Sequence, residues 1–278
     1  MSDTAWAVAG SRQTDGREDG RTPVRGVELG WTAEGNGPLT FWAHGMTNDR
    51  WALEEAGLYD WSPLVASGRR LVRFDARGHG SSGGRPVVED YVWTSLAQDF
   101  LALTDALSPD RAISAVGSSM GTATLLIAAL QAPQRFDRLV LTAAPTAWAA
   151  REDQAALYER SADMAERDGA AAFGQLASSQ PKRGLFADLP DYPPHLKVTD
   201  ALLPSVLRGG AASNLPGEAE IRGLSVPTLI LSYRDDPAHP VSTGQRLADL
   251  IPGAEFAVAG SVAELQTWGR RAAAFLSA

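Results

Sequence analysis

The feature that most constrains this chain is a short segment in which a serine stands midway between two glycines. The segment is Gly117-Ser118-Ser119-Met120-Gly121; an apolar run typical of a buried strand (residues 112–116) precedes it, and a run typical of a helix (residues 120–132) follows. Glycines on both sides of Ser119 allow a sharp strand-to-helix turn that exposes its hydroxyl at the positive end of the helix. We therefore predict a nucleophile elbow at Ser119. Ser118 lacks the symmetric glycines and is the weaker candidate.

Strand and helix patterns alternate on both sides of this elbow. The pattern predicts strands at residues 24–32, 39–43, 70–75, 112–116, 139–143, 227–233 and 255–259, and helices at 51–65, 92–107, 120–132, 241–250 and 262–276. Regular alternation of this kind favours an α/β fold with a mostly parallel sheet that is covered by helices on both faces.

Two regions fall outside the alternation. Residues 1–23 are polar and are expected to form an irregular N-terminal lead-in. Residues 145–222 show no clear strand, but contain alanine-rich helical segments and a proline-rich turn at 189–194. We predict that they form a helical lid inserted into a core made of residues 24–144 and 223–278.

Composition excludes several function classes. The chain has 278 residues and a net charge of −8, so nothing in it favours nucleic acid or anionic membranes as partners. It has no cysteine, and no two of its 4 histidines stand at metal-ligand spacing, so we expect no metal. No apolar run is long enough for a signal peptide or a membrane span. We expect a cytoplasmic protein acting on a small-molecule substrate. The sequence leaves its oligomeric state open.

Four segments together give the chain a family resemblance. They are His44-Gly45, Asp75-x-Arg77-Gly78-x-Gly80-x-Ser82, the elbow, and the stretch from Val226 to Pro240. In this order and spacing the chain resembles the α/β-hydrolase superfamily over residues 24–276. It looks most like the lidded kind, which includes esterases, lactonases, lyases and cofactor-independent peroxidases. The resemblance implies the α/β-hydrolase fold with an inserted helical lid and no cofactor, but it does not name the reaction.

The resemblance also assigns roles to particular residues. Ser119 matches the nucleophile, and the backbone N–H groups of Met46 and Met120 match the two donors of an oxyanion hole. Asp236, after a strand, matches the acid of the catalytic triad. The adjacent Asp235 is the alternative.

The family's histidine, which should follow the last strand, is missing. After residues 255–259 come Gly260 and the sequence Ser261-Val262-Ala263-Glu264, which is typical of a helix start. No histidine occurs after His239. Since a serine hydroxyl needs a base to become a good nucleophile, we predict an incomplete triad with a non-standard or missing base.

Other aromatic and histidine side chains are candidates for the site. His44, beside the predicted oxyanion hole, is a tentative catalytic residue, and His195, in the lid, is a tentative substrate contact. Trp42 and Trp148 are tentative substrate contacts as well, because they flank predicted active-site segments. For His239 we favour packing or a turn bond at the start of a helix.

Three hypotheses about function follow. In the first, the chain hydrolyses a small apolar ester, lactone or thioester through Ser119, with an unusual base. In the second, the same pocket carries out a lyase, cyclisation or proton-transfer reaction in which Ser119 and His44 hold the substrate. In the third, the chain is a catalytically silent small-molecule-binding homologue.

Overall fold

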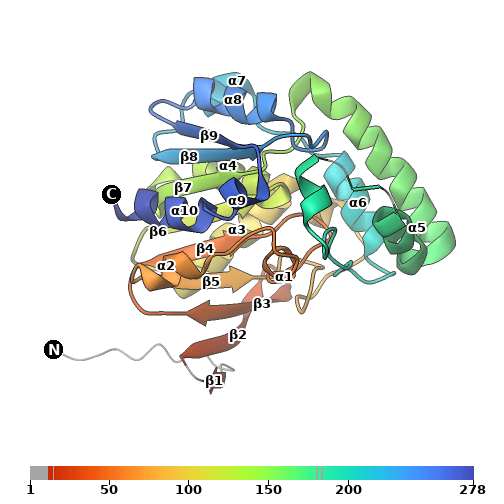
Figure 1. Cartoon of the computed structure of the whole chain (residues 1–278). Coiled ribbons are helices and arrows are strands. Elements are labelled where there is room, and N and C mark those ends of the chain that lie inside the picture. The colour runs from red at the N-terminus through yellow and green to blue at the C-terminus, as the bar shows by residue number, and fades with distance from the viewer. Residues whose placement is uncertain (1–11, 15, 180, 183) are drawn as a thin grey trace.

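A twisted sheet of nine strands forms the centre of the molecule (Figure 1). The computed structural model describes every residue except 1–11, 15, 180 and 183. The strands are β1 (Arg12–Thr14), β2 (Arg17–Val24), β3 (Val27–Glu34), β4 (Leu39–Ala43), β5 (Arg70–Phe74), β6 (Ile113–Ser118), β7 (Phe136–Thr142), β8 (Thr228–Tyr233) and β9 (Glu255–Ala259). Their order across the sheet is β1-β2-β3-β5-β4-β6-β7-β8-β9. From β5 to β9 all neighbours are parallel, while β1, β2 and β3 are antiparallel to theirs.

The helices connect these strands. They are α1 (Ala52–Glu55), α2 (Ser62–Ala66), α3 (Trp93–Leu107), α4 (Met120–Gln131), α5 (Arg151–Ser179), α6 (Leu203–Ala211), α7 (Glu218–Ile221), α8 (Val241–Leu250), α9 (Val262–Leu265) and α10 (Trp268–Ser277). Short 3₁₀ turns lie at Val88–Asp90, Pro133–Arg135, Trp148–Ala150 and Gly184–Asp188. The predicted alternation is confirmed. Two predicted helices, 51–65 and 262–276, are each divided into two shorter ones.

Alternating side chains of the parallel strands build a core on each face of the sheet. In β4, Phe41 and Ala43 pack with α3, α4 and α8 on one face, whereas Trp42 packs on the other face with residues of α2, α9 and α10. Burial of both faces explains why the central strands read as continuous apolar runs. It also makes the sheet a rigid support for the loops at its carboxyl edge.

The expectation that residues 1–23 are irregular is wrong for most of the described part, because β2 occupies Arg17–Val24. The inward-facing positions of this strand include Gly20 and Thr22, so the apolar alternation that predicts a strand is absent. The Trp31 side chain of β3 fills the space over Gly20, and its Nε1 donates a hydrogen bond to Thr22 Oγ1 at 2.9 Å. A partner on the neighbouring strand thus supplies the apolar surface that β2 lacks.

Helices occupy the long connection between β7 and β8, and we call residues 145–222 the helical insertion. Figure 1 shows α5 and α6 beyond the carboxyl ends of the parallel strands. Gly169, with φ 84° and ψ 165°, divides α5 into two helical halves, and the Asp200 carboxylate accepts a hydrogen bond from Ala170 N at 2.6 Å at the start of the second half. Arg208 of α6 joins the first half through its ion pairs with Glu159, Asp163 and Glu166.

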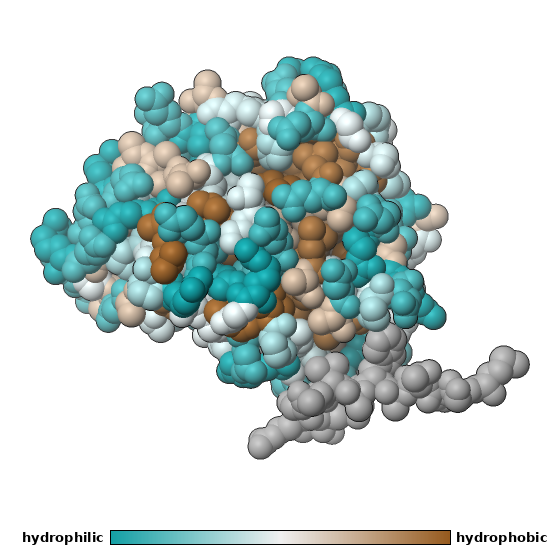
Figure 2. All heavy atoms as spheres, turned by 180° about the vertical axis from the view of Figure 1, so that it is seen from behind, coloured by the Kyte–Doolittle hydropathy of each residue, from teal (hydrophilic) through white to brown (hydrophobic). Residues whose placement is uncertain are grey.

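The face of the molecule that is seen in Figure 2 is mainly hydrophilic. Figure 2 shows hydrophilic residues over most of the rear face, with hydrophobic ones visible in limited areas between them. Of the helices in the described part of the chain, none combines the length and the apolar character that crossing a membrane requires.

Candidate active site

Ser119 stands at the turn between β6 and α4, as the sequence predicts. Its backbone has φ 54° and ψ −113°, an unusual conformation for a residue with a side chain. The turn is possible only because glycines flank it. A Cβ at Gly117 would lie 2.7 Å from the backbone of Gly121, and a Cβ at Gly121 would lie 2.0 Å from the carbonyl oxygen of Ala43. The strained turn leaves Ser119 partly exposed, whereas Ser118 is buried.

Ser118 is turned into the core on the other side of the strand end. Its Oγ lies 3.0 Å from the Tyr59 hydroxyl, which in turn is 3.4 Å from Thr142 Oγ1. Although Ser118 borders the same cavity, its buried hydroxyl is engaged by Tyr59, so it is less accessible than the hydroxyl of Ser119. The preference for Ser119 over Ser118 agrees with this geometry.

His239 connects Ser119 to Asp236. Its Nε2 lies 2.7 Å from Ser119 Oγ, and its Nδ1 lies 2.7 Å from Asp236 Oδ2. The expectation that Ser119 lacks a histidine partner is therefore wrong, and so is the purely structural reading of His239. No histidine follows β9, and the imidazole ring beside Ser119 comes from the turn between β8 and α8 instead.

Asp236, rather than Asp235, is the carboxylate in contact with His239. Burial would raise the pKa of the Asp236 carboxyl, but bonds from His239, the Ala238 N–H and the Tyr233 hydroxyl outweigh it and hold the pKa below its usual range. Asp235 is exposed and has φ 67°. The Asp236 carboxylate is thus ionised and fixed against the imidazole at neutral pH.

Met46 and Met120, the two predicted oxyanion-hole residues, follow Gly45 and Ser119 in the chain. Met120 is the first residue of α4, directly after Ser119, and Met46 follows Gly45 in the loop after β4. Within the part of the chain that the structure describes, neither backbone N–H donates to a protein acceptor. Gly45 lies close to the elbow, since a Cβ built on it would be 3.5 Å from Ser119 Cβ. Both N–H groups are therefore free of protein acceptors in the described residues, and their role as oxyanion donors stays a prediction.

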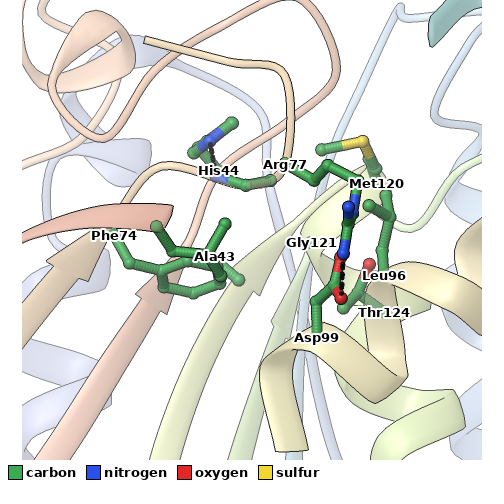
Figure 3. A pocket seen from close by; sticks show the side chains of 11 residues that line it. Ala43, His44, Phe74, Arg77, Leu96, Asp99, Met120, Gly121 and Thr124 are labelled. Atoms are coloured by element: carbon green, nitrogen blue, oxygen red, sulfur yellow. Dashed lines mark hydrogen bonds and ion pairs between the residues drawn. The ribbon is translucent and has the colours of Figure 1, made fainter. Parts of the chain in front are cut away.

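His44 does not join the site, which corrects its tentative catalytic assignment. Its Nε2 accepts a hydrogen bond from Ala76 N at 3.0 Å, so Nδ1 carries the proton and donates to Gly45 O at 2.8 Å. The ring is buried, and burial lowers its pKa. Figure 3 shows it beside an interior void of about 10 Å³, together with the Arg77–Asp99 ion pair. His44 shapes the loop that presents Met46.

A cavity of about 1240 Å³ opens beside Ser119 and His239, between the sheet edge and the helical insertion. His195 is among its lining residues, so the predicted position is confirmed, while its contact with a substrate stays a prediction. Trp42 and Trp148 are not in the lining: Trp42 is buried beneath the sheet, and Trp148 donates from Nε1 to Pro216 O at 3.0 Å. The two tryptophan assignments are therefore wrong.

Comparisons with known proteins agree with this geometry. A family model described as the alpha/beta hydrolase fold matches residues 43–268. A 3-oxoadipate enol-lactonase of Acinetobacter baylyi is 30% identical over 210 residues, which cover 71% of this chain and 74% of that protein. The chain belongs to the α/β-hydrolase family.

Solved structures of α/β-hydrolases share this fold at lower identity. An enol-lactonase from Burkholderia xenovorans superposes with a TM-score of 0.77 at 23% identity, covering 93% of this chain and all of that one. A thermophilic esterase from Thermogutta terrifontis gives 0.75 at 22% identity, covering 92% and 97%. At such identities the likeness establishes the fold of this α/β-hydrolase and leaves its substrate open.

One signal in the sequence of this α/β-hydrolase could have located the histidine that contacts Ser119. Asp236 and His239 are three residues apart in a turn that ends at Pro240, directly before α8. In such a turn, side chains at i and i+3 lie on the same side; here His239 N also bonds to Asp236 O at 3.2 Å. A search limited to the region after β9 misses this pair.

Metal chemistry has no comparable support, because no cluster of three or more suitable ligands occurs among the described residues.

Proposed function

We propose that this α/β-hydrolase cleaves a carboxylic ester or lactone, with Ser119 as nucleophile, His239 as general base and Asp236 as the acid partner of the histidine. The observation that carries the proposal is the unbroken chain of hydrogen bonds from Ser119 Oγ through the imidazole to Asp236 Oδ2, with both distances at 2.7 Å. Such a chain supplies the base whose apparent absence weakened the hydrolase hypothesis.

The reaction follows from this arrangement. His239 Nε2 takes the proton from Ser119 Oγ as the oxygen attacks the substrate carbonyl carbon. The negatively charged oxygen then sits at the N–H groups of Met46 and Met120. His239 returns the proton to the leaving alkoxide, and an acyl ester on Ser119 remains. A water molecule, deprotonated by His239, attacks that ester, and the acid leaves as Ser119 recovers its proton.

The cavity indicates a substrate larger than the smallest esters. Its volume of about 1240 Å³ exceeds the range of roughly 300–1,000 Å³ that is common for small-molecule pockets. Apolar side chains make up much of the wall: Met46, Leu53, Leu58, Leu157, Tyr158, Phe173, Leu176, Leu196, Leu207. We therefore propose esters or lactones with a bulky apolar part. A cytoplasmic location remains a prediction of the sequence.

The two alternative hypotheses lose their main support in the structure. The lyase hypothesis needs His44 to hold a substrate, and both of its ring nitrogens already bond to protein groups. The silent-binder hypothesis depends on the absence of a base, and the 2.7 Å contact between His239 and Ser119 supports a base at this position. Neither hypothesis has a separate observation in its favour.

Labelling with a fluorophosphonate, followed by intact-mass measurement, tests the proposal. We expect one label per chain, complete loss of labelling in Ser119→Ala, and normal labelling in Ser118→Ala, a matched control one residue away. Hydrolysis of aryl esters with increasing acyl length should follow the same pattern and favour the longer chains. If the folded native chain is not labelled over hours, or if Ser119→Ala is still labelled, the serine mechanism is wrong.

A further inference from the structure

A tyrosine at the end of β8 contacts the acid–base pair. The hydroxyl of Tyr233 lies 3.1 Å from Asp236 Oδ2 and 3.4 Å from His239 Nδ1. Asp236 Oδ2 therefore accepts from both the tyrosine and the imidazole, while Oδ1 accepts from Ala238 N at 2.9 Å. The mechanism above assigns no role to this hydroxyl.

We propose that Tyr233 is a positioning residue that fixes the Asp236 carboxylate against His239 and moderates its attraction for the imidazolium proton. The inference rests on the proposed function of Ser119 and His239, and extends it by one residue. Tyr233 acts through Asp236, since its hydroxyl bonds to the carboxylate and, within the described part of the chain, makes no hydrogen bond to Ser119.

The need for such a residue follows from the position of the base. Asp236 and His239 share one short turn, so no second loop holds the carboxylate against the ring. The turn itself is strained where it begins, because Asp235 has φ 67°. Tyr233 belongs to the sheet, and its hydrogen bond ties the mobile end of the acid side chain to the most rigid element nearby.

Aromatic packing holds Tyr233 in the required orientation. Its ring is 2% exposed and lies against Trp268 at 6.0 Å in a stacked geometry and Phe186 at 5.4 Å edge to face. A ring confined on two sides cannot turn its hydroxyl away without disturbing both neighbours. The bond to Asp236 is therefore set by the core and not by the turn.

Tyr233 stays a hydrogen-bond donor over the working pH range. Burial, together with neighbouring tyrosines and Asp236, raises the pKa of its hydroxyl well above the usual value. The other ionisable groups near Asp236 are His239 and Asp235 of the same turn, Tyr59 before α2, and two tyrosines of the helical insertion, Tyr158 and Tyr192. Since burial raises the pKa of each of these tyrosines, they too remain neutral.

The test compares Tyr233→Phe with Tyr192→Phe. Both substitutions remove one hydroxyl at a cavity wall, but among the described residues Tyr192 makes no hydrogen bond to Ser119, His239 or Asp236, and its ring stacks on Phe186 at 4.3 Å. For Tyr233→Phe we expect kcat to fall roughly 10-fold or more, as for loss of a hydrogen bond to a charged group, with KM changed less than about 2-fold. The acid-side midpoint of the kcat/KM profile should move up by roughly half a pH unit, because the carboxylate attracts the imidazolium proton more strongly.

A second measurement does not depend on catalysis. The pH midpoint at which the His239 ring takes up a proton, followed by NMR and assigned with His239→Ala, should also rise in Tyr233→Phe and stay unchanged in Tyr192→Phe. A rise in KM alone would make Tyr233 a substrate contact, and equal behaviour of the two variants in the NMR titration would refute the positioning role. If the native chain proves inactive, the serine mechanism fails, yet the NMR comparison still decides the role of Tyr233.

Discussion

The loops that follow β8 and β9 leave neighbouring parallel strands at the same edge of the sheet, but they differ in their contacts with Ser119. The loop after β8 holds Asp236 and His239, both in contact with the serine site. The loop after β9 has only Gly260 and Ser261 before α9 begins. There, Glu264 closes a helix cap by accepting from Gly260 N at 2.6 Å and donating its own N–H to Ser261 Oγ at 3.2 Å.

The difference shows that the turn at Ser119 needs an imidazole ring at one position beside the serine. The strand whose loop supplies this ring can vary. Because adjacent parallel strands end side by side, a turn from the neighbouring strand reaches the same point. Arg234 N, bonded to Ala259 O at 3.1 Å, keeps the two strand ends together. The shorter loop is then free to serve as a helix start.

Moving the histidine between the two loops should have the largest effect. We expect His239→Ala to lower kcat by about 10⁴-fold or more, since triad members act as a unit. Adding Gly260→His to this variant should restore less than about 10-fold, because the capped loop holds residue 260 away from the serine. Steady-state kinetics measure both effects. Full rescue by Gly260→His would show that the β9 loop can supply the histidine as well as the β8 loop does.

Within the β8 loop, substitution of the two adjacent aspartates should affect kcat very differently. Asp236→Asn should lower kcat by about 10²–10⁴-fold, because the amide no longer stabilises the imidazolium. Asp235→Asn, one residue earlier and exposed, should change kcat less than about 2-fold. If the two variants lose equal activity, the assignment of Asp236 as the acid partner is incorrect.

The same carboxylate should make stability depend on pH. The pKa of Asp236 is lower in the folded chain than in the unfolded one, so its bonds stabilise the fold above the unfolded value of about 3.9, and this stability is lost as the pH falls through the folded pKa. Urea unfolding between pH 3 and pH 7 should show the free-energy advantage of the native chain over Asp236→Asn shrinking toward acid pH. A constant difference would contradict the lowered pKa.

The β9 loop should respond in stability alone. Ser261→Ala removes the side-chain cap of α9 and should lower the free energy of unfolding by about 1 kcal/mol. The kcat of this variant should match that of the native chain, because no part of the cap touches Ser119 or His239. A large loss of kcat without unfolding would show that the second loop has a catalytic part after all.

Sequence reasoning located the elements with strong local signals. The bounds of β4, α8 and β9 agree with the predicted ranges, and the elbow was predicted because glycine spacing reports a backbone requirement directly. It missed β2, whose inward positions are small and whose apolar cover comes from Trp31 on the next strand. A strand whose apolar contacts come from a neighbouring strand shows no apolar pattern in its own sequence.

The sequence predicts a site residue where its role depends on the backbone conformation. It fails where the role depends on the direction in which the side chain points. The position of Ser119 follows from turn geometry, whereas the inward orientation of His44 goes with its bond to Ala76 in another loop; the donor roles of Met46 and Met120 stay predictions. The prediction misses His239 because the family pattern places the histidine after β9. A short-range pair, Asp236 and His239, would have been visible to reasoning from the turn alone.

Placing acid and base in one turn has a consequence for how the chain can change over time. Every side chain of the proposed triad lies at or before residue 239, so the last strand and its two helices act on the site only through packing, as Trp268 of α10 does against Tyr233. The C-terminal segment can therefore diverge as long as it preserves the fold and this contact. The segment from Tyr233 to His239 carries the positioning residue, the acid and the base together, so one short stretch of chain fixes their relative positions.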